Sequence, residues 1–252
     1  MTDFIPAAIG FGTGLLVGVT STGGGALLTP ALILLARVPP TVAIGSGVLI
    51  ASGMKLIGGG YYALHRQVHW PTVGRLAAGS IPGALAGMAI LDRLPVEQIE
   101  SWLTRFLGCV LVAAGAALLL QATRAERSRP HRAPPATVTM GLGFLTGILV
   151  TMTSVGSGSL LLSVLALRYP LRAREAVGTD LVHALLLSAV AALGHAGAGR
   201  VDAALAGATL AGAVPGVLIG ARLATSVRER ALRRALAVVL MGIGLPLAVF
   251  GV

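Results

Sequence analysis

The sequence predicts an all-α, polytopic membrane protein, and three features support this fold class. The chain has 252 residues, of which 55% are hydrophobic and only 11% are charged, whereas soluble domains carry about 25% charged residues. Apolar segments follow one another, several of them about 20 residues long, which is enough to cross a hydrocarbon core of roughly 30 Å. Glycine and proline recur at matching positions in two halves. We expect residues 1–252 to form one integral membrane domain.

The two halves align with each other at a nearly constant offset. Gly10 and Phe11 match Gly143 and Phe144, and the Pro82-Gly83 pair matches Pro215-Gly216. A constant offset that preserves glycine and proline indicates an internal repeat. We therefore predict repeat 1 over 1–121, a linker over 122–137 and repeat 2 over 138–252. The Pro-Gly pairs are either hinges or close-packing points, because proline removes a backbone hydrogen bond and kinks a helix.

The elements follow in the same order in both halves. The first half is expected to form helices over 4–19, 26–36, 42–64, 72–91 and 101–121, with a break over 20–25. The second half is expected to form helices over 138–152, 159–168, 175–197, 202–224 and 230–250, with its break after the first. The first two helices of the first half would measure only about 24 Å and about 16 Å. We interpret each such pair as a hairpin of short or half-spanning helices, with its Gly-rich bend inside the protein.

The distribution of arginine predicts which way each half points. The segment 124–135 between the halves is rich in arginine and proline and has no apolar period, so it is a linker. Short arginine-rich connections lie on the cytoplasmic side of membrane proteins. A cytoplasmic linker makes the first hairpin open outward and the second open inward. The sequence therefore predicts inverted-topology repeats, an architecture typical of secondary transporters that hold substrate near the midplane.

Composition also argues against several other classes of site. The net charge of +10 arises from arginines in short connections, without a basic stripe carrying aromatic residues, so we predict no nucleic-acid partner. The single Cys109 cannot form an internal disulfide, and we expect neither a cofactor nor a structural metal. His65 and His69 have the i, i+4 spacing of metal ligands, but their neighbourhood is typical of a membrane boundary. The predicted surroundings are the lipid bilayer, and the oligomeric state stays open, a homodimer included.

The two Gly-rich bends are the first candidate binding site. Each is followed by a helix start, and a helix N-terminus offers unpaired backbone N–H groups and partial positive charge. Glycine lets the backbone approach a ligand closely, so two such termini that face each other could bind an oxyanion. The alternative is tight helix packing by small residues. The candidate substrate-binding residues are Thr20, Ser21, Thr22, Gly23, Gly24, Gly25, Thr153, Ser154, Gly156, Ser157, Gly158 and Ser159.

Ionisable residues inside apolar segments are further candidates. Lys55 lies inside the predicted helix over 42–64, where a charged group is expensive and by default functional. It suits an anionic substrate, although it could instead snorkel to an interface or pair with Asp180. Asp180 and His183 lie three residues apart on one helix face and could carry a coupling proton. Asp180 could also neutralise a nearby arginine. His195 is expected at the outer interface.

Taken together, the motifs resemble those of the sulfite exporter TauE/SafE family. The resemblance rests on the two Gly-rich bends, the AIGSG and AVGTD segments, the RQVHW and GRVD turns and the paired Pro-Gly motifs. It implies a bacterial inner-membrane transporter of small sulfur-containing anions such as sulfite or organosulfonates, with transport that is secondary and proton-coupled. One difference between the bends is that Ser157 occupies the position of Gly24.

The favoured function is a secondary exporter that alternates access around a midplane anion site, with no enzymatic activity. One alternative is an anion channel on the same scaffold. Another is an intramembrane serine hydrolase, with Ser157 or Ser159 as nucleophile and His183 as base, which would need each serine–histidine pair within hydrogen-bond reach. The repetition of the bend argues against an enzyme, because an enzyme needs only one nucleophile.

Overall fold

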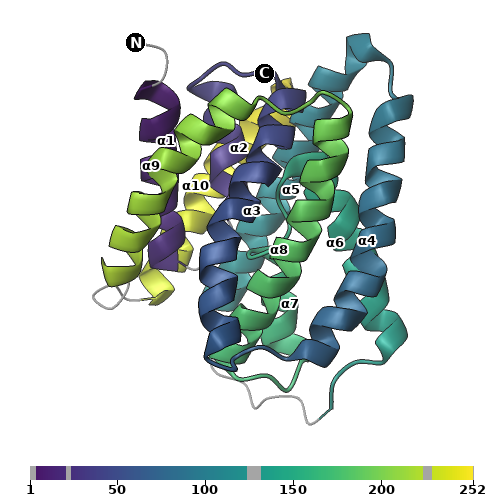
Figure 1. Cartoon of the computed structure of the whole chain (residues 1–252), viewed down its shortest axis with the longest axis vertical. Coiled ribbons are helices and arrows are strands. Elements are labelled where there is room, and N and C mark those ends of the chain that lie inside the picture. The colour runs from purple at the N-terminus through teal and green to yellow at the C-terminus, as the bar shows by residue number, and fades with distance from the viewer. Residues whose placement is uncertain (1–3, 21–23, 124–131, 224–228, 252) are drawn as a thin grey trace.

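A computed structural model describes residues 4–20, 24–123, 132–223 and 229–251, and within these ranges the regular structure is entirely helical (Figure 1). The helices are α1 (Phe4–Thr20), α2 (Gly25–Leu34), α3 (Pro40–Leu64), α4 (Trp70–Arg93), α5 (Val96–Thr123), α6 (Ala136–Thr153), α7 (Leu160–Arg168), α8 (Ala173–Gly197), α9 (Ala203–Leu223) and α10 (Glu229–Phe250). The predicted all-α class is confirmed. Most of the predicted linker over 124–135 lies outside the described residues.

Every predicted helix is present, but several begin earlier than expected. The largest difference is at α5, which begins at Val96 rather than near residue 101. The acidic segment expected as a connection instead forms the first turns of this helix, where the amide of Ile99 donates to the carbonyl of Pro95. Glu100 also ties α5 to α3 by accepting hydrogen bonds from the amide and hydroxyl of Thr41, at 3.2 and 2.6 Å.

Seven of the described helices are long and apolar enough to cross a membrane. The other α-helices of the hairpins are shorter, and α2 and α7 have only 10 and 9 residues. At 1.5 Å per residue these two measure about 15 and about 14 Å, half of a hydrocarbon core. The expectation of a short helix is wrong for α6, which at 18 residues qualifies as a span. In Figure 1, α2 lies in the upper half of the bundle and α7 in the lower half.

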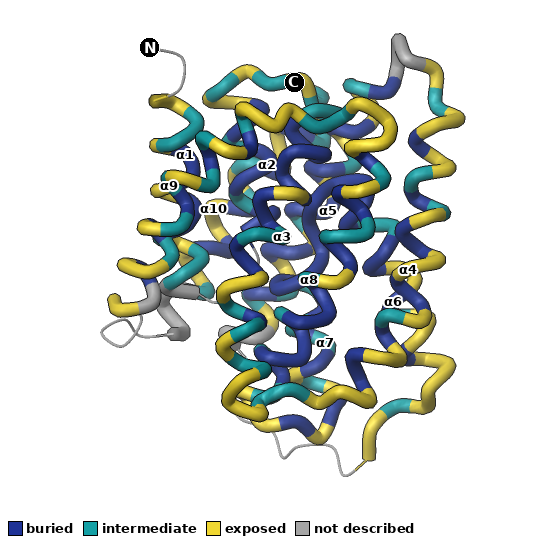
Figure 2. Tube along the Cα trace, viewed as in Figure 1, coloured by how far each residue is buried: buried dark blue, intermediate teal, exposed yellow. Residues whose placement is uncertain are grey.

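The centre of the bundle is formed by α3 and α8. In each, 61% of the apolar span is buried, against 28% for α9 and for α10. Figure 2 shows the same distribution, with buried residues along the inner helices and exposed residues on the outward faces. The two central helices run antiparallel, because Gly45 near the start of α3 packs on Arg200 just beyond α8, while Gly59 packs on Leu181.

Two peripheral helix pairs, α1 with α9 and α4 with α6, are held together by glycine. A Cβ atom at Gly10 would overlap the carbonyl oxygen of Thr209, and a Cβ atom at Gly143 would overlap that of Leu76. Gly10 and Gly143 are repeat-equivalent positions, and so are Leu76 and Thr209. Without glycine the backbones could not approach so closely, as in other small-residue contacts between membrane helices.

The paired Pro-Gly motifs lie in the same two interfaces. α4 continues through Pro82 and α9 through Pro215. A side chain at Gly83 would overlap the carbonyl oxygen of Phe144, and one at Gly216 would overlap that of Phe11. These observations favour close packing over a hinge at both motifs.

The AIGSG segment (43–47) and the AVGTD segment (176–180) occupy equivalent positions in the two repeats and make equivalent hydrogen bonds. The hydroxyl of Ser46 accepts a hydrogen bond from the amide of Asp202 at 3.0 Å, next to the start of α9. The hydroxyl of Thr179 accepts one from the amide of His69 at 2.9 Å, next to the start of α4. Each motif thus fixes the connection that leads into a peripheral helix, because its hydroxyl satisfies an amide at the helix N-terminus that has no intrahelical partner.

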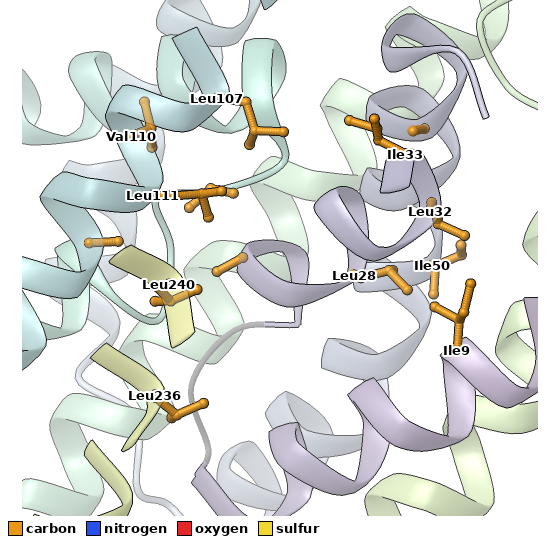
Figure 3. Packing of buried hydrophobic residues seen from close by; sticks show 14 of the residues in the cluster. Ile9, Leu28, Leu32, Ile33, Ile50, Leu107, Val110, Leu111, Leu236 and Leu240 are labelled. Atoms are coloured by element: carbon orange, nitrogen blue, oxygen red, sulfur yellow. The ribbon is translucent and has the colours of Figure 1, made fainter. Parts of the chain in front are cut away.

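A large apolar cluster surrounds the short helix α2. Leu28 and Leu32 of α2 are fully buried against Ile50 of α3, while Leu111 of α5 and Leu240 of α10 pack within the same cluster (Figure 3). In a bilayer the hydrophobic effect does not drive helices together, so close packing supplies the stabilisation. The half-length helix is therefore embedded in protein rather than exposed to lipid.

Candidate functional site

The second bend has a backbone that its sequence explains. α6 ends at Thr153, Ser154 adopts a left-handed conformation with φ 61°, and α7 begins at Leu160. Gly156 and Gly158 follow with φ of 137° and 83°, which glycine adopts without the steric cost of a Cβ atom. The hydroxyl of Thr153 accepts a hydrogen bond from the amide of Val155 at 3.1 Å and so fastens the turn. This irregular segment is almost fully buried, as non-helical chain at membrane depth must be.

The described part of the first bend touches the second. Ser21, Thr22 and Gly23 lie outside the described residues, and Thr20 is the last residue of α1. Gly24 precedes α2, and a Cβ atom at Gly25, the first residue of α2, would overlap the backbone oxygen of Ser154. The start of the half-helix of repeat 1 therefore lies directly against the bend of repeat 2.

Gly47 of α3 lies beside the same contact between α2 and the second bend. A Cβ atom at Gly47 would lie 2.8 Å from Thr29 Oγ1 and 3.3 Å from Ser154 Oγ. The absence of a side chain at Gly47 leaves room beside the two hydroxyls. Neither α2 nor α7 has a side-chain N-cap, so their first amides are not satisfied in the usual way.

Lys55 is buried and is held by hydroxyl groups only. Its ammonium donates to Ser157 Oγ at 2.9 Å and to Ser188 Oγ at 3.0 Å, and the residue is 4% exposed. Snorkelling to an interface is therefore wrong for Lys55. A direct ion pair with Asp180 is also wrong, because no contact within 4.0 Å joins the two groups. Among the described residues its hydrogen-bond partners are neutral hydroxyls, while the Asp180 carboxylate acts on it without direct contact. A buried cation without a counter-ion in contact is expensive, and a bound anion would stabilise it.

Asp180 and His183 lie on the same buried face of α8. Asp180 is 1% exposed and accepts a backbone hydrogen bond from Gly158, whereas His183 Nε2 contacts Ser80 Oγ at 2.9 Å. The two side chains share a face, as predicted, but are not joined by a hydrogen bond, since Asp180 Oδ1 and His183 Nδ1 each lack a partner. Because Asp180 is buried beside the second bend, the structure does not support its proposed role in neutralising an arginine.

Several other buried polar atoms near the bends have no hydrogen-bond partner in the part of the chain that the structure describes. They are Thr29 Oγ1, Thr151 Oγ1, Ser154 Oγ and Ser159 Oγ. Buried polar atoms are nearly always satisfied, so a group of orphan hydroxyls fits a site that binds a hydrogen-bonding ligand. The structure thus brings the second bend together with Lys55, Asp180 and the start of α2.

The serine hydrolase arrangement is not formed. His183 contacts Ser80 rather than Ser157 or Ser159, and the partner of Ser157 is Lys55. In the described ranges, His, Cys, Asp and Glu do not gather in groups of three that could hold a metal ion. His65 and His69 instead bond to Tyr61 O and Thr72 Oγ1, each at 2.8 Å.

His195, which is expected at the outer interface, lies in the last turn of α8, and its side chain is buried within the protein. His195 is 1% exposed, and its Nε2 lies 2.8 Å from the carbonyl oxygen of Thr151 in the last turn of α6. The interior tolerates the imidazole because this carbonyl satisfies one ring nitrogen, which hydropathy does not reveal.

Sequence reasoning missed Ser188, Ser80, Thr29 and Gly47. Ser188 could have been found, because it stands 133 positions after Lys55 and is therefore its repeat-equivalent residue. By the same offset Gly47 corresponds to Asp180. Ser80 and Thr29 carry no such signal, because their equivalents Ala213 and Leu162 are apolar.

Comparisons with known proteins agree with this architecture. The model of the family described as sulfite exporter TauE/SafE matches residues 6–247. The chain is 34% identical over 247 residues to the probable membrane transporter protein YjnA of Bacillus subtilis, which covers 95% of this chain and 97% of that protein. It is 31% identical over 223 residues to the probable inner membrane transporter protein TsaS of Comamonas testosteroni, covering 81% and 87% of the two chains. No solved structure matches the chain. A family match over nearly the whole length, on a bundle of membrane-spanning helices, shows that the chain is a membrane transporter of the sulfite exporter TauE/SafE family.

Proposed function

We propose that the protein is a secondary transporter that exports small sulfur-containing anions, such as sulfite or organosulfonates. The observation that carries the proposal is the ammonium of Lys55, which is buried and, among the described residues, hydrogen-bonds to Ser157 and Ser188. A singly or doubly charged oxyanion would compensate this charge. It would also accept hydrogen bonds from the orphan hydroxyls of Ser154 and Ser159 and from the amides at the helix starts.

The binding site lies between the two bends in this proposal. Its residues are Thr20, Ser21, Thr22, Gly23, Gly24, Gly25, Lys55, Thr153, Ser154, Gly156, Ser157, Gly158 and Ser159. Ser188 and Thr29 join them because their hydroxyls face the same cluster. The contact between Gly25 and Ser154 supports a shared site over two separate ones.

The repeats would rock about this site to alternate access. Three relations support an inverted repeat: α3 and α8 are antiparallel, α1–α9 and α4–α6 use equivalent glycines, and α2 and α7 occupy opposite halves of the bundle. Opposed repeats around a central site are typical of secondary transporters. With the 124–135 linker in the cytoplasm and the bacterial inner membrane as location, the α6–α7 hairpin opens inward. The name of TsaS as an inner membrane transporter supports the proposed location, and the arginine-rich connections support the proposed orientation.

Counterflow in proteoliposomes tests the function. Vesicles loaded with unlabelled sulfite or an organosulfonate should accumulate the labelled anion, and this exchange should saturate and be stimulated from the opposite side. Lys55→Met should reduce exchange at low anion concentration by roughly tenfold or more, because a charge-assisted hydrogen bond contributes about 1.5–3 kcal/mol.

Arg75→Gln is the matched control, because Arg75 is exposed on α4 and the substitution also removes one positive charge. It should retain exchange. Saturation without stimulation from the opposite side would make the protein a channel, and no flux of any small anion through folded protein would refute the proposal.

A further inference from the structure

A second, more accessible basic site lies at one end of the two central helices. A pocket of about 330 Å³ is lined by Arg66 and Gln67 of the α3–α4 connection and by Arg172, Arg174 and Glu175 at the start of α8. Three arginines and one glutamate are the charged residues that line it. The pocket is thus net positive in a chain that has only 9 acidic residues.

The carboxylate in the pocket is already engaged by the backbone. Glu175 Oε2 accepts a hydrogen bond from the amide of Arg172 at 2.8 Å, as in a helix capping box. No ion pair within 4.0 Å joins Glu175 to Arg66, Arg172 or Arg174. The three guanidinium groups therefore keep their donors for a ligand, and the positive end of the α8 dipole adds to their field.

The backbone that carries the pocket is fixed on the side of the α3–α4 connection. Arg66 has a left-handed φ of 54°. A side chain at Gly178 would overlap the carbonyl oxygen of Gln67, and the amide of His69 donates to Thr179 at 2.9 Å. These contacts hold the α3–α4 connection against α8. The backbone that carries Arg66 is therefore fixed relative to the start of α8.

The pocket and the buried site share the same two helices. Lys55 precedes Arg66 by 11 residues, about 16 Å along a helix, and Asp180 follows Arg174 by six residues, about 9 Å. We propose that this pocket is a capture site for an oxyanion group of the sulfonate or phosphate type, which concentrates the transported anion before it reaches Lys55. The capture role rests on the proposed function, whereas the binding of an oxyanion does not.

Planar guanidinium groups bind such ligands by paired hydrogen bonds. A free anion and the phosphate of a lipid headgroup have the same chemistry. We favour the free anion, because a pocket at the end of α3 and α8 lies in line with the buried lysine.

Binding of radiolabelled sulfate to purified protein in nanodiscs of zwitterionic phosphatidylcholine tests the site. The Lys55→Met variant removes the buried site and should leave one sulfate bound. In this background, Arg66→Gln, Arg172→Gln and Arg174→Gln should each weaken sulfate binding by about tenfold. Glu175→Gln should strengthen binding while its amide oxygen keeps the cap. Arg168→Gln is the matched control, because Arg168 is exposed at the end of α7 outside the pocket.

Ionic strength provides a second readout. The Debye length falls from about 30 Å at 0.01 M salt to about 8 Å at 0.15 M, so sulfate binding to the open pocket should weaken strongly over this range. In proteoliposomes, the triple glutamine variant should raise KM for the anion on the side of the pocket and leave the maximal rate unchanged.

The outcomes separate the two proposals. Sulfate binding that persists in Lys55→Met and disappears in the arginine variants supports the pocket even if no flux is ever found. If sulfate does not bind but the arginine variants lose co-purified phosphatidylglycerol, the oxyanion belongs to a lipid and the capture role is refuted. If the arginine substitutions change neither sulfate binding nor the amount of co-purified phosphatidylglycerol, the pocket is not an oxyanion site.

Discussion

At the scale of single residues, the most informative contact joins Lys55 to Ser188. The two occupy equivalent positions in the repeats, so the contact lies where the halves of the protein meet. The sequence offers the ammonium in one half and a hydroxyl in the other. The ammonium is therefore placed at the centre, where the buried carboxylate of Asp180 interacts with it electrostatically.

Asp180 is the residue whose replacement best tests proton coupling. Its carboxyl group is buried beside Gly158, and Oδ1 has no partner. Asp180→Asn keeps the shape but cannot take up a proton. We expect it to abolish anion transport driven by a pH gradient while retaining counterflow, since exchange requires no net proton movement. If the imidazole of His183 carries the same proton, His183→Gln should also lose transport driven by a pH gradient and retain counterflow.

Asp92→Asn is the control for this experiment. Asp92 is exposed and forms an ion pair with Arg200 at 2.8 Å, away from the bends. It should retain both activities. Coupled transport that survives unchanged in Asp180→Asn and His183→Gln would exclude both residues from coupling.

At the scale of helices, glycine decides which pairs pack. Gly10 and Gly12 of α1 form a matched pair, because a Cβ atom at Gly10 would overlap the backbone of Thr209, whereas one at Gly12 meets nothing within 4 Å. Gly143 and Gly141 form a similar pair on α6, with Gly143 against Leu76 and nothing within 4 Å of a Cβ atom at Gly141. α1 and α6 thus each offer a packed glycine and, two residues away, an open glycine that serves as its control.

These pairs make a prediction about thermal stability in detergent. Gly10→Ala and Gly143→Ala should each cost about 1–3 kcal/mol through overpacking, which lowers Tm by about 2–4 °C per kcal/mol. Gly12→Ala and Gly141→Ala should leave Tm unchanged or raise it, because alanine favours a helix by up to about 1 kcal/mol. Equal effects at packed and open glycines would contradict this account of the interfaces.

Helix identity was predictable from the sequence because the hydropathy of each segment and the repeated glycines agree. Helix ends were less predictable. The segment 96–100 reads as a polar connection, yet it is helical because Glu100 has a specific partner in Thr41. The site was predictable only in part, since Lys55 and the bends stand out locally. The pairing of His183 with Ser80 and of His195 with Thr151 depends on contacts between distant helices.

At the scale of the whole molecule, we predict that equivalent positions of the two repeats face opposite sides of the membrane. Two kinds of contact described above occur once in each repeat, through the glycines Gly45 and Gly178 and through the hydroxyls of Ser46 and Thr179. In Figure 1 the α3–α4 connection lies at the lower end of the bundle and the α8–α9 connection at the upper end.

Cysteine labelling can test this opposition directly. His65 and Ala198 are exposed and repeat-equivalent, so each can be replaced by cysteine after Cys109, which is exposed, has been changed to serine. A membrane-impermeant maleimide should label Ala198→Cys in intact cells and His65→Cys only in inside-out vesicles. The Cys109→Ser protein without a new cysteine gives the background. Labelling of both positions from the same side would mean that the halves are parallel. A site between opposed bends would then be untenable, because the two half-helices would enter the membrane from one side and could not present their N-termini to a shared anion.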